Sequence, residues 1–135
     1  MSGLDAVNVR VEGLPVHSTD NVLPVLHQVR HALHRLMSTG EPTTIDLSSI
    51  PFSQYDRDRL FETLGEGEVQ ARLDAFGPST VRETAFPGVW LIQHSSLQEK
   101  EFSTLIEITR MPSVLVTPEA DVEDSAAALE ARLAE

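Results

Sequence analysis

The apolar period of this chain changes from helical to strictly alternating in its second half, and this change restricts the fold more than any other feature. Apolar and polar residues alternate over Val69–Ala75 and again over Phe102–Thr109, with further strand-like stretches at Val81–Phe86 and Val89–Gln93. Alternation with a period of two is typical of strands that bury one face. The stretches are short and are separated by glycine, proline or polar residues, so the pattern predicts strands joined by turns.

Helical spacing of apolar residues predicts three helices, each with capping signals. The first runs from near Asp20 to Gly40, and the second begins with the capping pair Ser53 and Asp56 and ends at Gly65. The third follows Thr117-Pro118, starts with acidic residues that suit the helix dipole, and has an apolar face that must dock to be stable.

Two more strands are predicted at Ala6–Glu12 and Thr43–Leu47. The order of elements favours an α+β fold, a mostly antiparallel sheet with about three helices packed on it. A chain of 135 residues is long enough for one core, so we expect a single domain spanning residues 1–135.

The charge balance excludes several kinds of partner. The chain has 21 acidic and 10 basic residues, a formal net charge of −11, which disfavours binding to nucleic acids and anionic membranes. No apolar run approaches the ~20 residues that span a bilayer. The first residues lack the features of a signal peptide, so we expect a cytoplasmic protein.

The chain contains no cysteine, which rules out disulfides, thiolate nucleophiles and cysteine-ligated zinc or iron–sulfur sites. No Ser/His/Asp arrangement or phosphate-binding loop is recognisable either. We therefore predict no catalytic residues and no cofactor, and any role in metal-cluster chemistry would depend on ligands that a partner supplies.

Three histidines of the first predicted helix, His27, His31 and His34, fall on one helical face. Histidines at this spacing can hold nickel, zinc or copper, so a metal-handling accessory role is an alternative function. A solvated helix face explains the same pattern. Because no acidic residue lies between Asn21 and Gly40, this helix is the one locally basic surface, suited to an acidic partner or to the acidic C-terminal helix.

The stretch Phe86-Pro87-Gly88-Val89-Trp90 combines two large aromatic residues with a proline and a glycine. Proline is confined to edges, strand starts and bulges, so this stretch should be an edge strand or a bend that is exposed on one side. Two interpretations remain open. Either Phe86 and Trp90 both fill the core, or an exposed edge beside an aromatic residue captures an extended peptide.

Three separate stretches carry a family resemblance. They are LGEGEVQARL at Leu64–Leu73, VRETAFPGVWLIQ at Val81–Gln93 and LIEITRMPSVL at Leu105–Leu115. In this order and spacing they resemble the conserved C-terminal region of the hydrogenase expression/formation proteins called HupH, HoxQ or HyaF. The preceding segment Ile45–Gly65 is similar to the approach to the same region, and members of the family are typically longer at the N-terminus.

The resemblance implies a non-catalytic chaperone for the assembly of [NiFe] hydrogenases. Its expected partner is the immature, iron–sulfur-bearing small subunit, and other hydrogenase accessory proteins are further possible partners. The positions that match the family motifs are predicted to form a partner-binding surface rather than an active site. They are Gly65, Glu66, Gly67, Glu68, Glu83, Thr84, Phe86, Pro87, Gly88 and Trp90.

Overall fold

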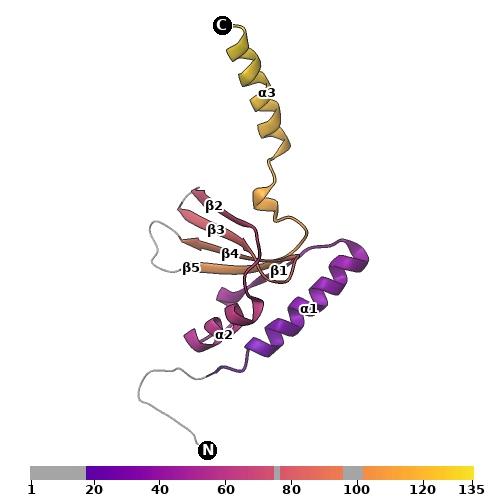
Figure 1. The fold of residues 1–135 in the computed structure, drawn as a ribbon, viewed down its shortest axis with the longest axis vertical. Coiled ribbons are helices and arrows are strands. Elements are labelled where there is room, and N and C mark those ends of the chain that lie inside the picture. The colour runs from indigo at the N-terminus through magenta and orange to yellow at the C-terminus, as the bar shows by residue number, and fades with distance from the viewer. Residues whose placement is uncertain (1–17, 75–76, 96–101) are drawn as a thin grey trace, which may run out of the picture.

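A computed structural model describes residues 18–74, 77–95 and 102–135. The strand expected at Ala6–Glu12 lies outside these residues. The described chain forms a single antiparallel sheet of five strands in the order β1-β5-β4-β3-β2 (Figure 1). Their bounds are β1 Thr43–Asp46, β2 Gln70–Asp74, β3 Pro78–Glu83, β4 Val89–Ser95 and β5 Phe102–Ile108. The predicted α+β fold class with an antiparallel sheet is therefore confirmed.

Two helices cover one face of this sheet, α1 (Val22–Thr39) and α2 (Gln54–Leu64). Helix α1 ends where predicted, because Gly40 adopts a left-handed φ of 78° and its N–H donates to the Leu36 carbonyl at 2.9 Å. Two short 3₁₀ turns, η1 (Leu47–Ser49) and η2 (Ser113–Leu115), follow β1 and β5.

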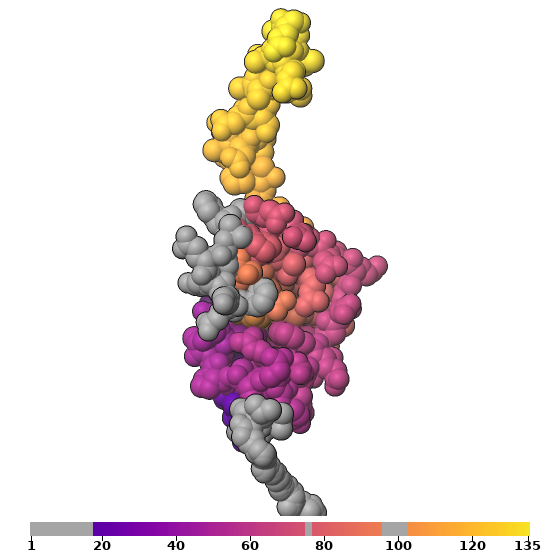
Figure 2. Space-filling model, turned by 90° about the vertical axis from the view of Figure 1, so that its left-hand side faces the viewer, coloured from indigo at the N-terminus to yellow at the C-terminus, as the bar shows by residue number. Residues whose placement is uncertain are grey.

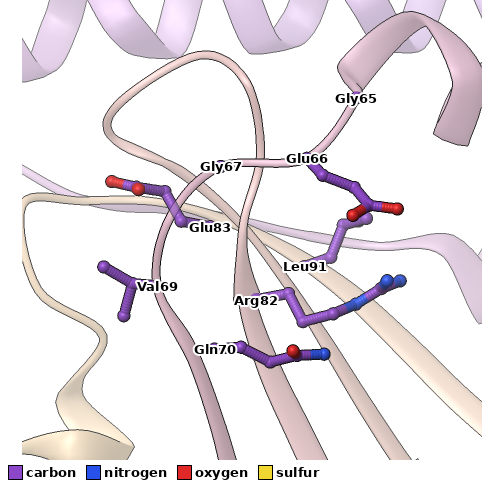
Figure 3. A pocket seen from close by; sticks show the side chains of 8 residues that line it. All are labelled: Gly65, Glu66, Gly67, Val69, Gln70, Arg82, Glu83 and Leu91. Carbon is purple, nitrogen blue, oxygen red and sulfur yellow. The ribbon is translucent and has the colours of Figure 1, made fainter.

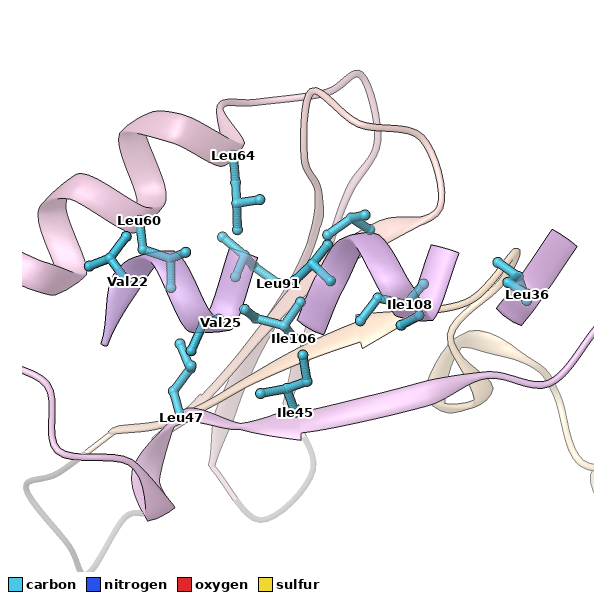
Figure 4. Packing of buried hydrophobic residues seen from close by; sticks show 13 residues of the cluster. Val22, Val25, Leu36, Ile45, Leu47, Leu60, Leu64, Leu91, Ile106 and Ile108 are labelled. Atoms are coloured by element: carbon cyan, nitrogen blue, oxygen red, sulfur yellow. The ribbon is translucent and has the colours of Figure 1, made fainter. Parts of the chain in front are cut away.

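The core lies between the sheet and these two helices (Figure 4). Strand register places Ile45 of β1 opposite Ile106 of β5, and Ile106 opposite Leu91 of β4. These three side chains therefore form a row on the helix-facing side of the sheet. Helices α1 and α2 contribute their own apolar faces to the same cluster, with Val25 and Leu60 both fully or almost fully buried.

A buried carboxylate joins the two helices at their N-terminal ends. The predicted capping box is present, with the Asp56 N–H donating to Ser53 Oγ at 3.1 Å and the Ser53 N–H donating to the Asp56 carboxylate at 3.1 Å. The backbone N–H and hydroxyl of Thr19, which precedes α1, also donate to this carboxylate. Burial alone would raise the pKa of Asp56, but these hydrogen bonds outweigh it and hold the pKa well below its usual range.

Helix α3 (Glu119–Leu133) departs from the expectation that all helices pack on the sheet. It begins one residue beyond Pro118 and buries none of its residues. Its apolar side chains are largely exposed, with Val122 at 55%, Leu129 at 61% and Leu133 at 77%. The helix was expected to dock, and on the described residues it does not: it leads away from the sheet and from α1 (Figure 1).

In the part of the chain that the structure describes, no helix combines the length and the apolar character needed to cross a membrane.

The Asp56 network generates a prediction for stability. Because the pKa of Asp56 is depressed in the folded state, the stabilisation is present above the ordinary pKa of 3.8 and is lost as pH falls below it. We expect Asp56→Asn to lower the free energy of unfolding by about 1–3 kcal/mol at neutral pH. The surrounding hydrogen-bond donors would then bind a neutral amide in place of a charged carboxylate. Urea unfolding of both proteins over a series of pH values measures the difference.

The difference between wild type and Asp56→Asn should shrink as the medium becomes more acidic. Glu62→Gln, at an exposed position of the same helix, is the matched control and should leave stability almost unchanged. A difference that stays constant below pH 3.8 would contradict the role given to the carboxylate.

Candidate partner-binding site

The three stretches that carry the family resemblance meet at one end of the sheet. In an antiparallel sheet the start of β2, the end of β3, the start of β4 and the end of β5 all lie at the same end. Backbone bonds join them there: the Gly67 N–H donates to the Glu83 carbonyl, and the Thr109 N–H to the Gly88 carbonyl, each at 2.9 Å. This region, hereafter the motif end, comprises Gly65–Val69, Glu83–Trp90 and Thr109–Pro112.

The glycines of the connection from α2 to β2 are required by its geometry. Gly65 ends α2 with a φ of 67°, a conformation that favours glycine. A Cβ atom on Gly67 would lie 2.4 Å from the Thr84 carbonyl oxygen, so no side chain fits between the connection and the β3–β4 turn. The absence of a side chain at Gly67 therefore permits this close backbone approach.

The β3–β4 turn is held from inside by Thr84, which is 1% exposed. The Thr84 hydroxyl accepts from the Phe86 N–H at 3.1 Å and lies 3.2 Å from the Phe86 carbonyl oxygen, to which it donates. The Val89 N–H also donates to the Phe86 carbonyl, and Gly88 takes a φ of 96°. The turn is therefore fixed by several bonds, and Phe86 and Pro87 at its tip are exposed.

Trp90 is a structural residue of β4. It is 3% exposed, and its indole Nε1–H donates to the Thr109 carbonyl at 3.0 Å. Strand β4 is the middle strand of the sheet, so the edge-strand alternative, and with it peptide capture along that strand, is wrong. The stretch is instead a bend exposed on one side, which was the other expected geometry. The interpretation in which Phe86 and Trp90 both fill the core is also wrong. The bend separates the two aromatic residues, leaving Phe86 48% exposed while Trp90 is buried.

Acidic side chains surround this turn. Glu66 and Glu68 are exposed, while Glu83 is half-buried and its Oε1 accepts from the Glu68 N–H at 3.3 Å. Figure 3 shows Glu66 and Arg82 pointing to one side of the strands and Glu83 to the other. The pocket that these residues line has a volume of about 40 Å³. Since pockets for small molecules typically measure ~300–1,000 Å³, this one suits a few water molecules rather than a metabolite.

All ten predicted residues lie within the motif end, but they differ in role. Thr84 and Trp90 are buried, Gly65, Gly67 and Gly88 shape the backbone, and the others present side chains to solvent. Two exposed apolar residues of the motif end, Val69 and Met111, were missed. The signal for both was available, since they belong to the first and third quoted stretches.

The three histidines lie where predicted, all exposed on α1. Their side chains do not form a metal centre: among the described residues, no three His, Cys, Asp or Glu side chains are grouped so that they could hold a metal ion. His31 instead lines a groove between α1 and the edge strand β1.

Comparison with known proteins identifies the family. The profile of the family described as "HupH hydrogenase expression protein, C-terminal conserved region" matches residues 19–135. The chain is 33% identical over 108 residues to the hydrogenase expression/formation protein HoxQ of Azotobacter vinelandii, an alignment covering 78% of this chain and 38% of that protein. It is 28% identical over 112 residues to the hydrogenase-1 operon protein HyaF of Escherichia coli, covering 83% and 39%.

A solved structure agrees with these matches. The hydrogenase expression protein HupH from Thiobacillus denitrificans is 42% identical and superposes with a TM-score of 0.83, covering 87% of this chain and 98% of that one. The chain spans about two fifths of the length of the curated relatives named above. The family profile covers all but the first 18 residues, and the chain belongs to the HupH family of hydrogenase expression proteins, of which it carries the C-terminal conserved region.

Proposed function

We propose that this chain is a non-catalytic accessory protein of hydrogenase maturation that binds the immature iron–sulfur small subunit of a [NiFe] hydrogenase through its motif end. A role in hydrogenase maturation is supported by relatives that are named as hydrogenase expression/formation proteins. The partner is the one that the family resemblance implies, and other hydrogenase accessory proteins are further candidates. The absence of cysteine suits a chaperone of a cysteine-ligated cluster protein, because a thiol-free surface does not compete for iron.

The observation that carries the proposal is the exposed Phe86 on a rigid turn. A large aromatic side chain that remains 48% exposed contributes little to the stability of the folded chain by itself. The backbone around it is nevertheless fixed by the Thr84 hydroxyl and by Gly88. A preorganised aromatic residue loses little conformational freedom on binding, and aromatic residues of this kind are common energetic anchors of interfaces.

The chemistry around Phe86 describes the surface that it fits. Val69 and Met111 add exposed apolar area at the same end of the sheet, 45% and 53% exposed. Glu66 and Glu68 provide negative charge at the rim. A complementary partner surface has an apolar pocket with basic residues around it, since opposite charges at a rim steer association and suppress wrong partners.

A binding role is favoured over a catalytic one by the geometry of the motif end. Its pocket of about 40 Å³ is too small for an ordinary substrate. The acidic residues around it are exposed or half-buried, and no nucleophile is placed beside a base among the motif-end residues described above.

The contribution of Phe86 to binding can be measured by truncating its side chain. We expect Phe86→Ala to weaken binding of the immature small subunit by about tenfold or more, because it removes the central apolar anchor. Its thermal stability should remain close to wild type, since the side chain is half exposed. Surface plasmon resonance with the immobilised small-subunit precursor gives both the affinity and the rate constants.

Tyr55→Ala is the matched control, because Tyr55 is another exposed aromatic residue, 41% exposed, and lies on α2. It should bind like wild type. Unchanged affinity of Phe86→Ala, or equal loss in both variants, would show that the partner binds elsewhere.

We expect Trp90 to stabilise the fold rather than to contact the partner. Truncating this buried ring leaves a cavity and frees the Thr109 carbonyl, so Trp90→Ala should lose about 3–5 kcal/mol of unfolding free energy. Trp90→Phe keeps most of the ring and should lose less. Denaturant unfolding measures both losses, and a Trp90→Ala protein that is as stable as wild type would contradict the structural role.

The alternative function, metal handling by His27, His31 and His34, has no observation in its favour beyond their exposure on one helix. We expect calorimetric titration with nickel or zinc to give affinity no better than millimolar, and His31→Ala to leave it unchanged, because the three side chains form no grouped ligand set in the described structure. Micromolar binding that depends on His31 would revive the metal-handling role.

A further inference from the structure

Helix α3 packs against no other element of the described residues. It has 15 residues, none of them buried, and it stands clear of the sheet and of α1 and α2 in two perpendicular views (Figures 1 and 2). An isolated helix of this length is marginal in water even with favourable composition. Its exposed Val122, Leu129 and Leu133 therefore call for a surface that covers them.

The sequence of α3 specifies the kind of surface. Val122, Ala126, Leu129 and Leu133 are separated by four, three and four residues, which places them in one narrow seam. Glu123 and Glu130 flank this seam on one side. The segment from the start of α3 to residue 135 carries six acids and a single base: Glu119, Asp121, Glu123, Asp124, Glu130 and Glu135 against Arg132. Two α3 helices would repel each other, so the acidic flank of the seam requires a basic surface instead.

The outer face of α1 is such a surface. It exposes His27, Arg30, His31, His34 and Arg35, and no acidic residue lies between Asn21 and Gly40. Of the two arginines, Arg35 forms an exposed ion pair with Glu41 at 2.9 Å.

A groove runs beside this face, between α1 and the edge strand β1. It has a volume of about 240 Å³, with Ala32 and Ile45 as an apolar floor and His31 and Arg35 at the rim. The Thr43 hydroxyl, also in its lining, is buried and has no hydrogen-bond partner within the described structure. The groove thus combines apolar depth, a basic rim and an unused polar group.

We propose that α3 of one copy of this chain packs into the α1–β1 groove of a second copy, and that the partner's α3 packs reciprocally into the first. The apolar seam would cover the groove floor, and Glu123 and Glu130 would face the basic rim. Glu123 and Glu130 are seven residues apart, ~10.5 Å along α3, so they present a row of negative charge to the rim formed by His31 and Arg35.

A second copy is favoured over an unrelated partner because one chain presents both complementary surfaces. Their reciprocal use gives a closed twofold dimer, the commonest symmetric assembly. Stable interfaces bury about 1,200–2,000 Å², so each of the two reciprocal contacts of this ~22 Å helix would have to bury about half of that area. The contact uses no residue of the motif end, so it goes beyond the proposed hydrogenase role and is tested separately from it.

The test is sedimentation equilibrium of the full chain, followed by charge reversal on each side. Wild type should dimerise reversibly. Glu123→Arg/Glu130→Arg makes the flank of α3 positive, and His31→Glu/Arg35→Glu makes the rim of the groove negative. The dissociation constant of the dimer should rise about tenfold or more in each variant alone, because both reciprocal contacts then bring like charges together.

Mixing the two reversed variants gives the decisive measurement. In the mixed dimer one contact pairs the reversed α3 with the reversed groove, and the other pairs the two unchanged surfaces. Heterodimers should therefore form with roughly wild-type affinity, detected by energy transfer between differently labelled variants. Asp124→Arg/Glu135→Arg is the matched control, with the same change in net charge at one residue on the opposite side of α3 and one beyond its last turn; it should dimerise like wild type.

Three results would overturn the proposal. They are a monomeric wild type at all concentrations, a control that dissociates as readily as the reversed variants, and a mixture of reversed variants that stays monomeric. Circular dichroism should show all variants folded, since every changed side chain is exposed.

Discussion

The register in which β4 pairs with β5 and β3 determines both the core and the motif end. It places Leu91 beside Ile106 on the face that α1 and α2 cover, and it places Trp90 between Glu83 and Glu107 on the other face. A shift of one residue would exchange these two sets, moving apolar side chains out of the core and a tryptophan into the helix interface. Gly88 fixes this register at its start, because its carbonyl accepts from the Thr109 N–H.

The same register explains why three separate stretches of sequence form one surface. Each stretch contains the start or the end of a strand, and antiparallel pairing brings those strand ends together. Gly67 completes the arrangement by allowing its backbone to approach the Thr84 carbonyl to a distance that no Cβ atom permits. The surface is therefore built from backbone geometry, and its exposed side chains are few: the aromatic tip, the neighbouring acids and two aliphatic residues.

Local signals predicted the elements well. The Ser53–Asp56 capping box, the stop at Gly40 and the alternation within β5 depend on neighbours in sequence, and all were recovered. The position of β4 in the sheet was not recoverable, because strand order depends on pairing between distant residues. Pro87 was compatible with an edge or a bend, and only the turn geometry decided between them. The exposure of individual motif residues, Phe86 outside and Trp90 inside, followed from that same turn.

The burial of Trp90 has a practical consequence for observing this protein in solution. It is the single tryptophan of the chain, held away from water and hydrogen-bonded to the Thr109 carbonyl. Its fluorescence therefore reports the integrity of the central strands, and its emission should move to longer wavelength when the sheet opens. Because α3 buries none of its residues against the body of the chain, ordering of that helix should leave the signal nearly unchanged. The protein thus contains an intrinsic optical probe for its core, which separates events in the sheet from events at its C-terminal helix.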